Sequence, residues 1–252
     1  KCDALVPSYL RFIKGLVDTQ DIDLNVSREM LQNNPAVSKI SKSLVGKILR
    51  ELKKVSEKNV DGYKNFWKEY GPVLKEGLYE DAERKETLLD LCRFSTNEND
   101  EIMSLSSYLE KMPENQKDIY YISAETRSQA LASPHLEGFK SKNIPVLIMT
   151  DAIDQFWLPM IGSFKDKKFT SITQGQINLD DLDEKNKDKK SDSKDQKEKQ
   201  DKEFVDLIAQ MKVVLGEQVK DIRLSSKLTD SPVCLVADDG DMDIAMEQLM
   251  AQ

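Results

Sequence analysis

Residues 118–123 (DIYYIS) and residues 144–149 (IPVLIM) decide the fold class, because both are short runs rich in β-branched, aromatic and aliphatic side chains. A third run of this kind follows at residues 168–172 (KFTSI). Segments with helical character separate the runs, at residues 125–132, 136–142 and 151–161. Strands that alternate with helices predict a small α/β unit with a partly parallel sheet.

The sequence before this unit has a helical rhythm. Apolar residues recur at steps of three and four between Val37 and Val55, with basic residues between them. This spacing predicts a long amphipathic helix with a basic outer face. A second helix is expected from about Tyr63 to a break at the Gly-Pro pair of residues 71–72, and a third, shorter one at residues 84–92.

The sequence after the α/β unit changes in composition. Residues 183–203 contain no aliphatic or aromatic side chain, so they bury too little apolar area to offset chain entropy and are expected to form a solvated linker. A strand pair is expected at residues 219–224 and 233–237. The chain then stops inside a new helical pattern at residues 241–252.

Composition excludes several classes of function. The 252 residues carry a net charge of −8, whereas nucleic-acid binders show a basic bias, and the apolar run 144–149 is far shorter than the ~20 residues that span a bilayer. A single histidine, His135, leaves almost no material for a catalytic triad or a metal site. Cys2, Cys92 and Cys234 are far apart, which indicates reduced thiols and a cytoplasmic location. We therefore expect no metal and neither nucleic acid nor membrane as a partner.

A nucleotide should not bind tightly to this chain alone. Residues 45–48 (VGKI) lack the leading glycine and the following Ser or Thr of a phosphate-binding loop, and no G-x-G-x-x-G is present. The chain begins at Lys1 without a methionine, which suggests a fragment.

The most informative stretch for chemistry is residues 23–32 (DLNVSREMLQ). Ser27 is a suitable N-cap for a helix, and Arg28 and Gln32 are four residues apart, so they share one helical face. An arginine at a loop-to-helix junction can be aimed at phosphate oxygens with its planar fork. The alternative is an ordinary surface arginine or salt-bridge partner, which is the more common case.

These stretches resemble a known family. Residues 5–18 (LVPSYLRFIKGLVD) followed by residues 24–32 (LNVSREMLQ) are similar to the middle-domain signature of the heat shock protein 90 chaperones, in the bacterial HtpG type. Similarity continues at residues 112–122 (MPENQKDIYYI), 146–154 (VLIMTDAID) and 227–232 (KLTDSP). The resemblance covers most of the middle domain and the start of the C-terminal domain, without the nucleotide-binding domain.

The resemblance implies a fold of the α/β (α+β) class. Long amphipathic helices would precede a small αβα sandwich unit, and a truncated α+β C-terminal domain would follow. The expected segments are the end of a large middle-domain unit with the catalytic loop (1–60), a helical connector (61–95), the small αβα unit (96–178), the charged linker (179–203) and the truncated C-terminal domain (204–252).

The resemblance also implies a role in ATP hydrolysis. In the family, ATP with magnesium is bound by an N-terminal domain outside this chain, and a middle-domain arginine matching Arg28 reaches the γ-phosphate. A glutamine matching Gln32 supports it, and Asn25 lies in the same loop. Such an arginine stabilises charge on the transferring phosphoryl group. We expect the chain alone to hold no cofactor, to be inactive as an ATPase and to be mostly monomeric, while the full-length stress-response protein is a homodimer.

Unfolded or partly folded client proteins are the partners that the family implies. Two apolar groups are candidate client contacts: Phe156 with Trp157, and a stripe at helical spacing formed by Met242, Met246, Leu249 and Met250. Each group has an alternative role in core packing. Pro159 departs from the family pattern and leaves the local helix geometry open.

Two other classes of function compete with a chaperone. A helical scaffold or adaptor would use the long basic-faced helix as a docking surface and would show no coupling to nucleotide. A self-contained enzyme built from scattered carboxylates would need a cleft with strongly perturbed acids, although no paired-carboxylate motif stands out in the sequence.

Overall fold

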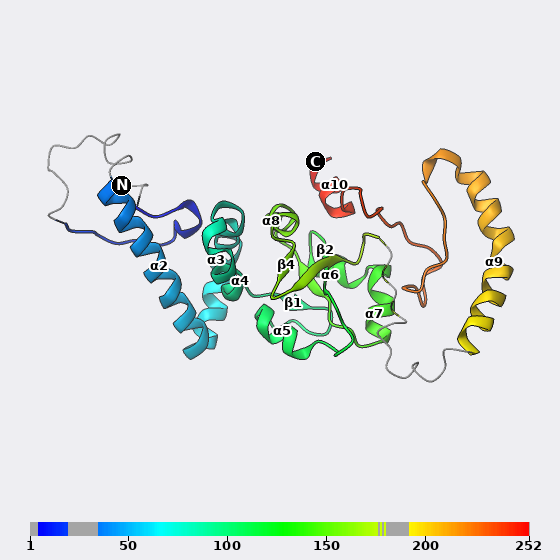
Figure 1. Ribbon diagram of the computed structural model, residues 1–252, viewed down its shortest axis with the longest axis horizontal. Coiled ribbons are helices and arrows are strands. Elements are labelled where there is room, and N and C mark those ends of the chain that lie inside the picture. The colour runs from blue at the N-terminus through cyan, green and yellow to red at the C-terminus, as the bar shows by residue number, and fades with distance from the viewer. Residues whose placement is uncertain (1–4, 20–34, 176, 178, 180–191, 252) are drawn as a thin grey trace.

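The computed structural model describes residues 5–19, 35–175, 177, 179 and 192–251, with the backbone alone for residues 192–203. The molecule is elongated, with α2 (Pro35–Lys58) towards one end, a small α/β unit in the middle and α9 (Asp192–Leu215) at the other end (Figure 1). No helix among the described residues is both long and apolar enough to cross a bilayer.

Helices form the first part of the chain, as the apolar spacing predicts. The long amphipathic helix is α2, which buries Val37, Val45 and Leu49 along one face. It is followed by α3 (Val60–Glu80), whose N-cap Asn59 accepts a hydrogen bond from a backbone amide. The remaining elements of this part are η1 (Ser8–Leu10), η2 (Ala82–Arg84) and α4 (Lys85–Leu91).

The expected break at residues 71–72 is wrong, because α3 continues through Pro72 to Glu80. A proline inside a helix removes one backbone hydrogen bond. The helix nevertheless has strong packing on both sides of that point, since Trp67, Leu74 and Leu78 are all buried in the core. Burial of these large side chains outweighs the local cost of the proline. A Gly-Pro pair in the sequence does not show whether such packing is present.

The predicted α/β unit is confirmed as a five-stranded mixed sheet of order β1-β3-β2-β5-β4. Strands β2 (Ile119–Ser123), β3 (Leu147–Met149) and β5 (Lys167–Ser171) are the three predicted runs, and β2 pairs in parallel with both others. Two edge strands of two residues each were not predicted: β1 (Ser95–Thr96) pairs antiparallel with β3, and β4 (Ser163–Phe164) pairs antiparallel with β5.

Helices cover both faces of this sheet. They are α5 (Leu105–Lys111), α6 (Arg127–Leu131), η3 (Pro134–Leu136), α7 (Glu137–Ser141) and α8 (Asp154–Ile161). In β2, Ile119 packs into one core cluster and Ile122 into another, because alternate residues of a strand face opposite ways. The first cluster also contains Tyr9 and Leu49, so the preceding helices and one face of the sheet share a continuous core.

The region after the sheet differs from expectation in two ways. Helix α9 begins at Asp192, inside the stretch predicted to be a linker. Lys, Glu and Gln have high intrinsic helix propensity, and residues 192–203 are rich in them. The strand pair predicted at residues 219–224 and 233–237 is wrong, because these residues are irregular apart from an isolated bridge between Gln174 and Ala237. The chain continues through η6 (Gly216–Gln218) to α10 (Ile244–Met250).

Two helical glycines provide a direct test of this packing. A Cβ on Gly77 would lie 2.8 Å from ring carbons of Tyr9 and 3.0 Å from Leu88, whereas a Cβ on Gly46 would meet nothing within 4 Å. We expect Gly77→Ala to destabilise the protein by about 1–3 kcal/mol through overpacking. Gly46→Ala should instead stabilise it by up to ~1 kcal/mol through helix propensity. Urea unfolding of both variants measures this, and equal stability of the two would contradict the close approach at Gly77.

Candidate functional site

The three residues predicted to act on ATP, Asn25, Arg28 and Gln32, lie outside the described residues. Their roles therefore stay predictions. The structure does place the second group of predicted residues, those proposed to contact client proteins, on α8 and around α10.

The two adjacent aromatic residues of α8, Phe156 and Trp157, lie on opposite faces of the helix. Trp157 is completely buried, and its indole Nε1 donates a 2.7 Å hydrogen bond to Oδ1 of Asp154. Phe156 is 43% exposed, and its ring meets the edge of the exposed Tyr79 at 6.5 Å between centroids. Trp157 is therefore a core residue that no client can reach, and Phe156 is the member of the pair at the surface. Pro159 is accommodated inside α8.

A buried charge cluster sets the position of α8. Nζ of Lys75, on α3, donates to Asp151 at 2.8 Å and to Asp154 at 2.9 Å. It also lies 4.8 Å from the ring centroid of Phe94. Burial alone would lower the pKa of Lys75, but the negative charges of Asp154 and Asp151 outweigh this and raise it to about 12. The cluster joins α3 to the first turn of α8.

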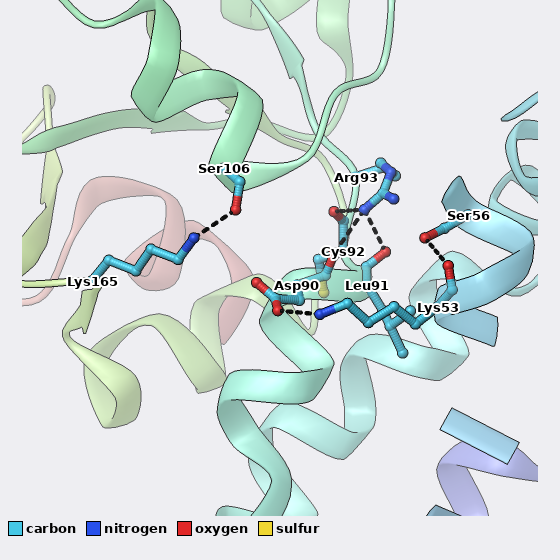
Figure 2. Close-up of polar contacts among 8 residues, drawn as sticks. All are labelled: Lys53, Ser56, Asp90, Leu91, Cys92, Arg93, Ser106 and Lys165. Carbon is cyan, nitrogen blue, oxygen red and sulfur yellow. Dashed lines mark hydrogen bonds and ion pairs between the residues drawn. The ribbon is translucent and has the colours of Figure 1, made fainter. Parts of the chain in front are cut away.

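A second polar joint connects α4 to the strand that follows it (Figure 2). The guanidinium of Arg93 donates to the carbonyls of Asp90, Leu91 and Cys92 at 2.8–3.1 Å, where a cation complements the helix dipole. Lys53 of α2 reaches the carboxylate of Asp90 at 3.1 Å. These contacts close the C-terminal end of α4 and tie that helix to α2.

The predicted methionine stripe is only partly a helical stripe. Met242 lies before the N-cap Asp243, so it is not on the face of α10. Within the helix, Met250 is 67% exposed, while Met246 and Leu249 are half-buried. The exposed apolar surface here consists of Met242 and Met250 rather than all four residues.

Polar contacts fasten the segment before α10 to the α/β unit. Asp243 accepts hydrogen bonds from the hydroxyls of Ser171 and Thr173 at the end of β5. The buried Lys227 donates from Nζ to the carbonyls of Ile172 and Gly175, at 3.1 and 3.2 Å. Sequence reasoning missed these residues as a fastening, because their partners are more than fifty positions away.

Glu137, on α7, completes this attachment. Its Oε2 accepts from the backbone amides of Thr229, Asp230 and Ser231 at 2.8–3.1 Å, and its Oε1 accepts from the Ser231 hydroxyl. The neighbouring Gly138 amide donates to the Lys227 carbonyl at 2.7 Å. One carboxylate therefore satisfies a whole turn of backbone donors.

Among the described residues, no group of three or more His, Cys, Asp or Glu is placed to hold a metal ion. Burial raises the pKa of the Cys92 thiol to about 12, so the thiol, not the thiolate, is the favoured form at neutral pH. Burial also raises the pKa of the Asp154 carboxyl, but that group is enclosed in the core beside Lys75.

Comparison with known proteins identifies the family. The model of the Hsp90 protein family matches residues 1–252. The chain belongs to the Hsp90 family. This confirms the resemblance seen in the motifs.

Three relatives give the extent of the match, and each is named chaperone protein HtpG. The protein of Roseobacter denitrificans is 47% identical over 246 residues, covering 98% of this chain and 39% of its own length. That of Paramagnetospirillum magneticum is 46% identical, with coverages of 99% and 40%. That of Mycobacterium avium is 43% identical, with coverages of 94% and 36%. The chain thus spans about two fifths of the length of these Hsp90 relatives.

The Hsp90-like motif at residues 227–232 has a structural role. Residues 227–232 (KLTDSP) supply both Lys227 and the amides that Glu137 binds. The Ser231 hydroxyl first, and then the three backbone amides, lower the pKa of Glu137 to about 2. The motif is therefore a docking turn whose partner is a carboxylate on α7.

This docking turn should loosen in acid. A carboxyl with a depressed pKa stabilises the fold above its ordinary pKa of 4.5, and that contribution is lost as the pH falls towards about 2. We expect Glu137→Gln to increase amide hydrogen exchange at residues 229–231 at pH 7, because a neutral amide is a weaker acceptor. Glu110→Gln, on an exposed position of α5, is the matched control. Unchanged exchange in Glu137→Gln would contradict the docking role.

Proposed function

We propose that this chain is the client-binding and ATPase-completing part of a cytoplasmic Hsp90-family chaperone that binds non-native proteins. The observation that carries the client-binding role is the exposed apolar surface on a rigid base. Phe156 and Met160 project from α8 at helical spacing, and Phe156 meets the exposed Tyr79 of α3. The base is rigid because Lys75 and Trp157 fix α8 from within.

The chemistry of this surface suits clients that share no sequence. Unfolded proteins present irregular apolar segments, and methionine and aromatic side chains adapt to such shapes. Exposed apolar groups that gather on one element are typical of interaction sites. The exposed Met242 and Met250 beside α10 offer a second contact of the same kind.

Charged substitutions separate client binding from stability. We expect Phe156→Glu and Met250→Glu to weaken binding of an unfolded client roughly tenfold each, equivalent to about 1.4 kcal/mol. Their thermal midpoints should stay close to that of the parent, because exposed positions contribute within about 0.5 kcal/mol. Val60→Glu, at an equally exposed apolar residue at the start of α3, is the control.

Fluorescence titration with a permanently unfolded client, together with thermal melts of the same samples, measures both quantities. Parent-like affinity in both variants, or an equal loss in Val60→Glu, would contradict this client surface.

The ATPase role is supported by family membership and by the motif around Arg28. We propose that ATP with magnesium binds in a part of the full-length protein outside this chain, and that Arg28 reaches its γ-phosphate. Gln32 would orient the arginine, and Asn25 would shape the same loop. The full-length protein would act as a homodimer. A scaffold or adaptor, the competing function, requires no such coupling to nucleotide.

An arginine of this kind acts in the transition state more than in nucleotide binding. In the full-length protein, we expect Arg28→Ala to lower ATP turnover by roughly 10³–10⁵ while ATP affinity stays nearly unchanged. Arg50→Ala, an exposed arginine of α2, is the control. Steady-state turnover and equilibrium nucleotide binding measure the two effects. Full turnover in Arg28→Ala would remove Arg28 from this role and favour the scaffold.

A further inference from the structure

The exposed methionines of the chain coincide with the proposed client surface. Of the nine methionines, Met30 lies outside the described residues, which leaves eight. Three of these are exposed: Met160 at 58%, Met242 at 47% and Met250 at 67%. All three belong to the apolar groups on α8 and beside α10 that are proposed above to contact clients. The other five are half-buried or buried, and Met149 in β3 is only 1% exposed.

The thioether gives these positions a property that aliphatic side chains lack. Methionine is among the residue types most often buried in proteins, so its exposure at three client-contact positions requires a reason. Flexibility of the side chain is one reason, because it adapts to irregular partners. The sulfur adds another, since an oxidant converts it to a polar sulfoxide and a reductase can reverse the reaction.

The described cysteines compete poorly for an oxidant. A thiol reacts as its thiolate and at an accessible site. Cys92 is buried and Cys234 is half-buried, and burial raises the pKa of both thiols. A thioether loses no proton when it is oxidised. Within the described part of the chain, the exposed methionines are therefore the sulfur atoms most open to attack.

Oxidation at the three exposed positions should spare the fold. The inner face of α8 is held by the contacts of Asp154 with Lys75 and with the indole of Trp157. The segment that carries α10 is held by Asp243, which accepts hydrogen bonds from two hydroxyls at the end of β5. These contacts do not use an exposed methionine. A sulfoxide at the buried Met149 would instead place a polar oxygen in the core.

A sulfoxide would change the surface that clients meet. It gives a flexible apolar side chain a strong hydrogen-bond acceptor. An apolar client segment that packs on this side chain then buries an oxygen without a partner, which costs free energy. The rings of Phe156 and Tyr79, 6.5 Å apart between centroids, remain available. Client binding should therefore weaken rather than disappear.

We propose that Met160, Met242 and Met250 form a reversible oxidation switch that lowers the affinity of this chain for non-native clients. The oxidant is a peroxide. Its O–O bond breaks, one oxygen atom forms a bond to the sulfur, the sulfur loses two electrons, and the remainder leaves as water or an alcohol. A methionine sulfoxide reductase returns two electrons from a dithiol and releases the oxygen as water. This inference rests on the client-binding role proposed above.

Peptide mass spectrometry after timed treatment with hydrogen peroxide tests the oxidation sites without reference to clients. In the folded chain, the three exposed methionines should gain one oxygen atom at least about tenfold faster than Met149, because susceptibility follows exposure. In urea, where the chain is unfolded, all methionines should react at similar rates. The thermal midpoint of the oxidised chain should stay close to that of the untreated chain, since exposed positions contribute little to stability.

Fluorescence titration with an unfolded client that lacks methionine and cysteine tests the switch. Affinity of the parent should fall roughly threefold to tenfold after peroxide, as expected for loss of apolar contacts. Treatment with reductases for both sulfoxide epimers should restore it. A triple variant with Met160→Leu, Met242→Leu and Met250→Leu should have the same affinity before and after peroxide, whatever its starting value. Met112→Leu, half-buried at the end of α5, is the matched control and should respond like the parent.

Four results would overturn the proposal. Oxidation of Met149 as fast as of the exposed methionines would mean that exposure does not select the sites. Unchanged affinity of the oxidised parent, together with lost affinity in Phe156→Glu, would leave the client surface standing without the switch. An equal response of the triple variant to peroxide would place the sensitive group elsewhere. Parent-like affinity in both Phe156→Glu and Met250→Glu would remove the client surface, and the switch with it.

Discussion

The buried contact of Lys75 with Asp151 and Asp154 is the constraint on which the rest of the structure depends. A buried lysine is tolerated only where carboxylates compensate for its lost hydration, and both carboxylates here come from one turn at the start of α8. The pair fixes the distance and the rotation of α8 relative to α3. Because α3 belongs to the helical part and α8 to the α/β unit, the two parts cannot separate without breaking this ion pair and exposing the apolar core that they share.

The rotation of α8 determines which side chains remain for function. Asp154 and Trp157 are three residues apart and share the inward face, where the indole donates to the same carboxylate that binds Lys75. Phe156 and Met160 are four apart and must then share the outward face. The exposed apolar surface is thus a geometric consequence of the buried ion pair. An adaptable contact surface on a rigid base is what a chaperone for unrelated clients requires.

Local sequence patterns were sufficient to predict α2 and the three longer strands. The periodicity of their apolar residues shows which faces are buried, and this periodicity is visible in a short stretch of sequence. The edge strand β1, the passage of α3 through Pro72 and the irregular course of residues 219–237 were not predictable, because long-range packing decides them. Spacing could suggest the four-residue methionine stripe but not that the helix begins after Met242.

The C-terminal segment is attached by polar groups, and this explains how α10 can keep apolar residues exposed. Glu137, Lys227 and Asp243 bind hydroxyls, amides and carbonyls with good geometry, and such charge-assisted hydrogen bonds are directional. They position α10 without enclosing it in a core. Ile244, on the inner side of the helix, is half-buried, while Met250 stays at the surface.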